Sequence, residues 1–237
     1  MRAVIVVCLL AACGGKSSQA PDAAPPDAHV PRAVVYLSFD GEMVMPPASG
    51  TDSDAATNTT AVVSKPTTLP PYLDGATERD ARIAAIVTAV GQRLHPYDVE
   101  VVTTRPTEAG YTMMLFTGDA TLVGQGSGLS AMAPFDCTKP QPTAITILFQ
   151  SSTTGDTYGP EFKANLVIGA LGFEHQLPPV AKTGDCMCWV GSMCGDNESA
   201  CTVGGAGTPV ETSFACQGSP AMIDEQALFT AALGARP

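Results

Sequence analysis

The chain has 237 residues, of which 45% are hydrophobic and 15% are charged, and its net charge is −11 at neutral pH. This composition is typical of a globular domain and excludes a wholly disordered chain. The negative charge argues against a nucleic-acid partner, because binding phosphates requires clustered Lys and Arg.

The first residues have the pattern of an export signal. Arg2, the apolar run AVIVVCLL and a few small residues precede Cys13, and the apolar run is too short to span a bilayer. The sequence LAAC, ending at Cys13, resembles the lipobox of bacterial lipoproteins. This resemblance implies a signal peptide over 1–12, a lipid on Cys13 and a bilayer anchor in the cell envelope. Gly14 favours the outer membrane, facing the periplasm or the exterior, and a plain secreted protein is the alternative.

The segment after Cys13 predicts a tether. Residues 13–32 are rich in Pro, Ala and Asp and lack aromatic residues and apolar periodicity, so they cannot bury enough surface to fold. His29 lies there and is a poor ligand candidate. The remaining residues, 33–237, are long enough for one domain with a full core.

Apolar periodicity predicts the elements of this domain. Residues 77–94 form a helix, with Thr77 and Asp80 as an N-cap pair, and a second helix runs from Pro160 to about Leu171, with Gly172 as its stop. The residues 223–233 form a last helix, and 40–71 form a loop. Predicted strands cover 33–39, 97–105, 111–118, 143–150 and, more weakly, 120–128.

The cysteines predict a stapled C-terminal part. Without Cys8, in the signal, and the lipid-bearing Cys13, six of the eight cysteines remain, which in an exported chain indicates three disulfides with open connectivity. Cys186 and Cys188 are too close to pair with each other. The six candidates are Cys137, Cys186, Cys188, Cys194, Cys201 and Cys216.

The predicted class is α+β, with a mixed twisted sheet, two packing helices over 33–175 and a disulfide-rich part over 176–237 that ends in a helix. This element order is similar to the metzincin metallopeptidases, which carry the zinc-binding motif H-E-x-x-H-x-x-G-x-x-H on a helix, followed by a Met-turn. The segments VVYLSFDGE, YDVEVVTTRP and GLSAMAPFDC resemble those of secreted bacterial metzincin-like proteins. In DCMCW, Met187 resembles the Met-turn methionine.

Only part of the zinc motif is present in NLVIGALGFEH, which spans Asn165 to His175. Gly172 and His175 match the glycine and the third histidine. Asn165 replaces the first histidine, Leu166 the glutamate that acts as general base, and Gly169 the second histidine. The resemblance therefore implies a pseudoenzyme without a catalytic residue or a zinc cofactor.

Three functions follow as hypotheses. The first is a noncatalytic envelope lipoprotein that binds a protein or peptide along an edge strand. The second is a zinc peptidase with an unusual metal site around His175, for which Glu174, Asp185, Cys186 and Cys188 are the neighbouring ligands. The third is a purely structural disulfide-rich envelope protein. A buried helix with an ordinary glycine cap also accounts for the segment 165–175 by itself.

Overall fold

The computed structural model describes residues 30–50, 52–188, 199–213 and 215–237. One compact unit spans Pro31–Pro237. The predicted signal peptide, Cys13, nearly all of the predicted tether and Cys194 lie outside the described residues. In the described part of the chain, none of the helices is both long and apolar enough to cross a bilayer.

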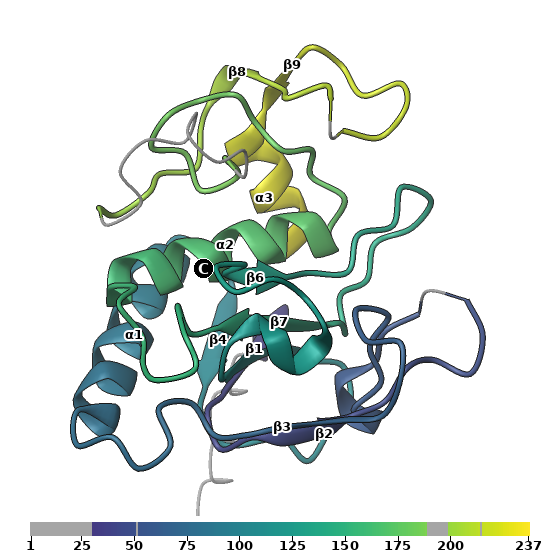
Figure 1. The fold of residues 1–237 in the computed structure, drawn as a ribbon. Helices are drawn as coiled ribbons and strands as arrows, with labels where there is room; N and C mark the ends of the chain where they lie inside the picture. Colours follow the sequence, from purple (N-terminus) through teal and green to yellow (C-terminus); the bar gives the residue numbers. More distant parts are fainter. Residues whose placement is uncertain (1–29, 51, 189–198, 214) are drawn as a thin grey trace, which may run out of the picture. The chain divides into compact units, whose positions relative to one another are not determined.

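A five-stranded mixed sheet forms the centre of this unit (Figure 1). β1 pairs in parallel with β4 and β5, β5 pairs in parallel with β7, and β6 pairs antiparallel with β7. The predicted mixed sheet is thereby confirmed. In spatial order the strands are β4 (Val99–Val102), β1 (Ala33–Ser38), β5 (Thr112–Thr117), β7 (Ile145–Phe149) and β6 (Ala131–Met132).

Both faces of the sheet are covered, and the alternation of side chains along each strand shows how. On β1, Val35 and Leu37 belong to the core cluster that contains the helices α1 (Arg79–Leu94) and α2 (Pro160–Glu174). Tyr36, between them, belongs to a second cluster on the opposite face. The helix predicted over 77–94 from apolar periodicity is confirmed, since its large apolar residues lie in or against the helix-side core: Ile83, Ile86, Val87, Val90 and Leu94.

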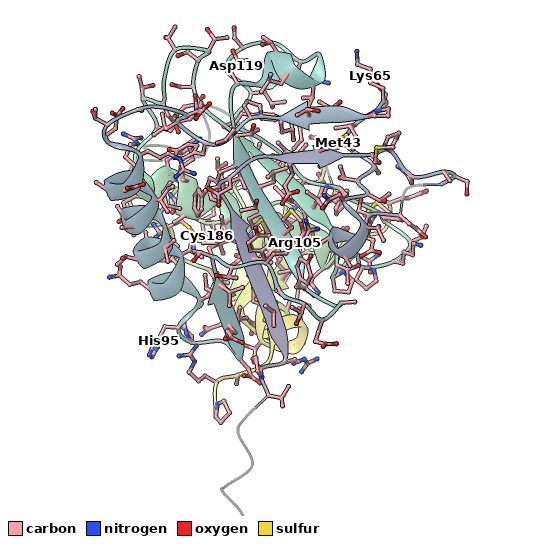
Figure 2. All side chains as sticks on the ribbon, turned by 90° about the horizontal axis from the view of Figure 1, so that it is seen from below. Met43, Lys65, His95, Arg105, Asp119 and Cys186 are labelled. Atoms are coloured by element: carbon pink, nitrogen blue, oxygen red, sulfur yellow. A yellow bond between two sulfur atoms is a disulfide. The ribbon has the colours of Figure 1, made fainter. Side chains whose placement is uncertain are left out.

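The segment predicted as a loop over 40–71 contains regular structure that covers the second face. Its strands β2 (Glu42–Val44) and β3 (Thr67–Leu69) form an antiparallel pair, and η1 (Ala55–Thr57) is a short 3₁₀ helix. Arg105 holds this segment to the sheet by donating to the Ala55 carbonyl oxygen at 2.6 Å and pairing with Glu42 at 3.3 Å (Figure 2). Three-residue strands are too short for alternation to reveal them.

Two further local predictions are wrong. The weak strand expected over 120–128 is instead η2 (Ala120–Val123), a 3₁₀ helix that Asp119 caps by accepting from the Thr121 amide at 3.2 Å. The first helix begins at Arg79 without a side-chain cap, so Thr77 and Asp80 do not form the expected N-cap pair. Both errors arise where a short polar side chain can satisfy more than one turn geometry.

The C-terminal part contains the strands β8 (Ala206–Pro209) and β9 (Met222–Asp224) and the helix α3 (Glu225–Leu233), drawn above α2 in Figure 1. The predicted final helix is thus confirmed. Disulfides join Cys137 to Cys216 and Cys186 to Cys201. The first bond ties this part to the segment that follows β6, and the second ties Cys201 to the segment that carries Met187.

Candidate functional site

The residues that resemble the zinc motif lie on α2, and the first of them is used to hold the neighbouring chain. Asn165 donates from Nδ2 to the Ser199 carbonyl oxygen at 2.8 Å. Its Oδ1 accepts from the Cys201 amide at 3.1 Å. Both ends of the amide therefore bind backbone groups of the 199–201 segment, which the Cys186–Cys201 disulfide also fixes. The Asn165 side chain clamps this segment onto α2.

The next two motif positions are part of the packed helix surface. Leu166 is half-buried and packs against the helix-side core. Gly169 is buried within α2 and offers no side chain to the space around the helix. Neither position can supply a metal ligand or a general base, because both lack a polar side chain.

Gly172 lies inside α2 rather than at its end. The sequence predicts that the helix stops there, but α2 continues to Glu174, and the left-handed residue is Gln176, with φ 64°. A methyl group on Gly172 would collide with the Met187 side chain and lie 3.1 Å from Phe229 Cζ. The glycine is required because Met187 packs directly on the helix backbone. Met187 itself lies in a turn in which the Cys188 amide donates to the Asp185 carbonyl oxygen at 3.2 Å.

His175 lies at the far end of α2 from Asn165. Its amide donates to the carbonyl oxygens of Leu171 and Gly172, so it continues the helical path. Ten residues separate it from Asn165, which corresponds to roughly 15 Å along a helix axis. The imidazole lines a cavity of about 120 Å³ that Arg32 also lines. Burial, helped by the Arg32 charge, lowers the pKa of His175 and favours the neutral ring.

The other histidine of the folded part, His95, follows the last residue of α1 and is exposed (Figure 2). His95 belongs to no metal-binding motif in the sequence, and it does not line the His175 cavity. Its position is that of a solvated helix end.

The alternative ligand set around His175 is engaged in other contacts. Cys186 is bonded to Cys201, and Cys188 is also disulfide-bonded, so their sulfurs are not thiolates. Glu174 points beneath α2, where it accepts from Thr146 Oγ1 at 2.8 Å, and complete burial raises its pKa to about 8. Among the described residues, no group of three or more His, Cys, Asp or Glu side chains could hold a metal ion.

A buried ion pair fixes the N-terminal half of α2. Lys163 Nζ lies 3.0 Å from Asp156 Oδ2, and both side chains are 0% exposed. Tyr72 donates its hydroxyl to the same carboxylate oxygen at 2.8 Å. Burial lowers the pKa of Lys163 to about 8, against the opposing effect of Asp156. The only signal in the sequence is a lysine within a mainly apolar helix, and that signal does not identify its partner.

The central sheet has two edge strands, β4 and β6, and β6 pairs only with β7. The Phe149 amide donates to the Ser130 carbonyl oxygen at 2.9 Å, and Ala131 lies opposite Leu148. In an antiparallel pair the hydrogen-bonded positions alternate. Ser130 and Met132 therefore point their backbone groups toward β7, whereas the amide and carbonyl of Ala131 point away from it.

The segment that contains β6 runs alongside α2. Before the strand, the Gly128 carbonyl oxygen accepts from the Tyr158 hydroxyl at 3.3 Å, next to the start of α2. After the strand, the rings of Phe135 and Phe173 pack edge to face with centroids 5.4 Å apart, near the end of α2. The segment from Gly128 to Phe135 is therefore held near both ends of α2.

Comparison with protein-family models and with curated protein sequences gives no match for this chain.

Proposed function

We propose that this chain is a cell-envelope lipoprotein whose domain is a noncatalytic, metzincin-like binding module. In this proposal Cys13 carries the lipid, and the domain captures an extended peptide or protein segment along the edge strand β6. The peptide adds one strand to the sheet, and no metal or catalytic residue takes part.

The Asn165 clamp is the observation on which the proposal rests. A metzincin-like zinc site would need a histidine at this position, with its ring directed at the metal. Here the Asn165 side chain donates to the Ser199 carbonyl oxygen and accepts from the Cys201 amide. In this chain the position has a different physical task, which is to hold the C-terminal part against α2. That task suits a binding module, because it keeps the C-terminal part in a fixed position on α2.

The resemblance itself draws support from two packing features. The mixed sheet ends in an antiparallel edge strand beside a helix, which is the arrangement in which an extended chain can pair with the edge. Met187 lies against Gly172, as a methionine beneath the helix would. Fold likeness does not establish activity, so the proposal depends on the side-chain contacts rather than on the likeness alone.

Strand addition at Ala131 defines the recognition chemistry. Ala131 is only 5% exposed, so in the proposed complex the side chains over it move aside, and its outward amide and carbonyl then offer one donor and one acceptor to a partner strand, independent of the partner's side chains. Leu129, which is 38% exposed, and the half-buried Met132 add apolar surface near these groups. We therefore expect the ligand to be an extended segment with apolar side chains at alternate positions.

The test uses a displayed library of linear decapeptides selected on the full chain with its disulfides intact. Selected peptides are then measured against the wild type and against Ala131→Pro, which removes the outward donor but leaves the bonds to β7 in place. Losing the donor and disturbing the neighbouring acceptor removes about 1–3 kcal/mol, which corresponds to a roughly 5- to 150-fold loss of affinity. Ala131→Ser is the matched control and keeps wild-type affinity.

A second arm of the test changes only the peptide. Methylation of alternate backbone nitrogens in a selected peptide blocks binding in one register and leaves it intact in the other, because only alternate amides face β6. Equal binding of both methylated forms, or a library that yields no binder, would contradict strand addition.

A further inference from the structure

Two buried carboxyl groups meet between α3 and the segment that carries Met187. Asp185 is 5% exposed and Glu225, the first residue of α3, is 0% exposed. A methyl group placed on Gly204 would lie 2.9 Å from Asp185 Oδ2 and also 2.9 Å from Glu225 Oε2. The two oxygens are therefore separated by no more than twice that distance, and both carboxyl groups converge on one point.

In each carboxyl group of the pair one oxygen accepts a backbone hydrogen bond, and the other oxygen can bind or accept a shared proton. Asp185 Oδ1 accepts from the Met187 amide at 3.0 Å, and Glu225 Oε2 accepts from the Gly204 amide at 2.9 Å. Asp185 Oδ2 and Glu225 Oε1 have no hydrogen-bond partner in the described part of the chain. Two buried carboxylates at this separation repel each other, and a single shared proton turns the repulsion into a hydrogen bond.

The charged and titratable surroundings do not neutralise the pair. Lys182 Nζ lies 3.7 Å from Asp185 Oδ2, and its side chain is 44% exposed, so solvent screens it. Tyr97 is the other titratable neighbour, and burial together with Glu225 raises its pKa to about 12, which keeps it uncharged. Burial, with the Asp185 charge adding to it, raises the pKa of Glu225 to about 8.

We propose that Asp185 and Glu225 form a pH-sensitive latch, in which one shared proton fastens α3 and Gly204 to the Met187 segment. Loss of that proton in alkaline solution separates the two carboxylates and loosens the contact. Because Met187 also packs on Gly172 of α2, the latch couples α3 to α2. The disulfides Cys137–Cys216 and Cys186–Cys201 remain closed, so the response is a local opening rather than unfolding.

The sign of the effect follows from proton linkage. Glu225 has a higher pKa in the folded chain than in the unfolded chain, so the folded state binds more protons between these two values. The contribution of the latch is complete below the ordinary pKa of a glutamate and declines as the pH rises through about 8. This inference goes beyond the proposed peptide binding and does not depend on it.

Hydrogen exchange of the full chain tests the latch, because two of its contacts are backbone amides. The protection factors of the Gly204 and Met187 amides, corrected for the intrinsic rate at each pH, are expected to fall at least tenfold between pH 6 and pH 9. Amides of the central sheet, such as that of Leu115, keep their protection. Glu225→Gln, which cannot ionise, removes the pH dependence, and the exposed control Glu100→Gln retains it.

Either of two results would overturn the latch: wild-type protection of Gly204 and Met187 that stays constant from pH 6 to pH 9, or the same fall in Glu225→Gln. If that variant does not fold, titration of the Glu225 carboxyl carbon by NMR in the wild type decides. A midpoint far above that of an ordinary glutamate supports the shared proton, and a midpoint close to the ordinary value overturns it.

Discussion

Replacing Lys163 by methionine removes the positive charge from a buried ion pair and leaves Asp156 charged. Removal of one partner of a buried pair costs about 3–5 kcal/mol. Asp156 keeps the Tyr72 hydroxyl at 2.8 Å and the backbone amides of Ser151 and Tyr158 at 3.1 and 3.0 Å. Since these donors still solvate the carboxylate, we expect a value near the lower end, about 3 kcal/mol, which corresponds to a melting temperature lower by roughly 6–12 °C.

The exposed pair between Lys139 and Asp52 provides the matched control, since Lys139→Met makes the same change on the surface and leaves the melting temperature unchanged. Combining Lys163→Met with Asp156→Asn restores part of the loss, because the buried negative charge is removed as well. Thermal unfolding followed by circular dichroism, with disulfides intact, measures all four proteins. A Lys163→Met midpoint equal to that of Lys139→Met would refute the reasoning.

Three other substitutions test the contacts of α2. Asn165→Ala removes both bonds of the clamp and lowers the free energy of unfolding by about 1–3 kcal/mol in urea; an unchanged midpoint would show that the clamp carries no stability. Gly172→Ala drives a methyl group into Met187 and lowers the free energy of unfolding by about 1–3 kcal/mol. The control Gly91→Ala lies on α1 with open space around it and raises the free energy of unfolding by about 0.5–1 kcal/mol. Equal effects of the two substitutions would contradict the packing argument. The raised pKa of Glu174 makes the free energy of unfolding of the wild type fall as the pH rises from 5 to about 8. Glu174→Gln removes part of that fall, on the order of 2 kcal/mol, and parallel pH profiles of the two proteins would contradict this expectation.

The sheet and helices were predictable wherever apolar periodicity extended over several residues. β1, β5 and β7 are buried on both faces and read as continuous apolar runs, as parallel strands do. β2 and β3 escaped prediction because three residues carry almost no pattern. The end of α2 was misplaced because a glycine after a helical stripe usually marks a stop, and only the packing of Met187 on Gly172 explains its interior position.

The site was less predictable than the fold, because its important contacts join residues distant in sequence. Asn165 meets the 199–201 segment, and Lys163 meets Asp156 across a loop. The local sequence identifies polar residues on apolar elements but does not identify their partners. The same holds for Asp185 and Glu225, whose proximity depends on how α3 folds back onto the segment after α2. Cysteine counting, in contrast, correctly indicated that Cys186 pairs with a residue other than Cys188.

The measurement that tests the central claim most directly is the zinc content of the disulfide-intact protein after dialysis, together with casein cleavage by the same sample. The account predicts zinc well below one equivalent and no cleavage, because the Asn165 amide is committed to Ser199 and Cys201. About one equivalent of zinc, lost together with cleavage in His175→Ala, would contradict the account and indicate an unorthodox peptidase.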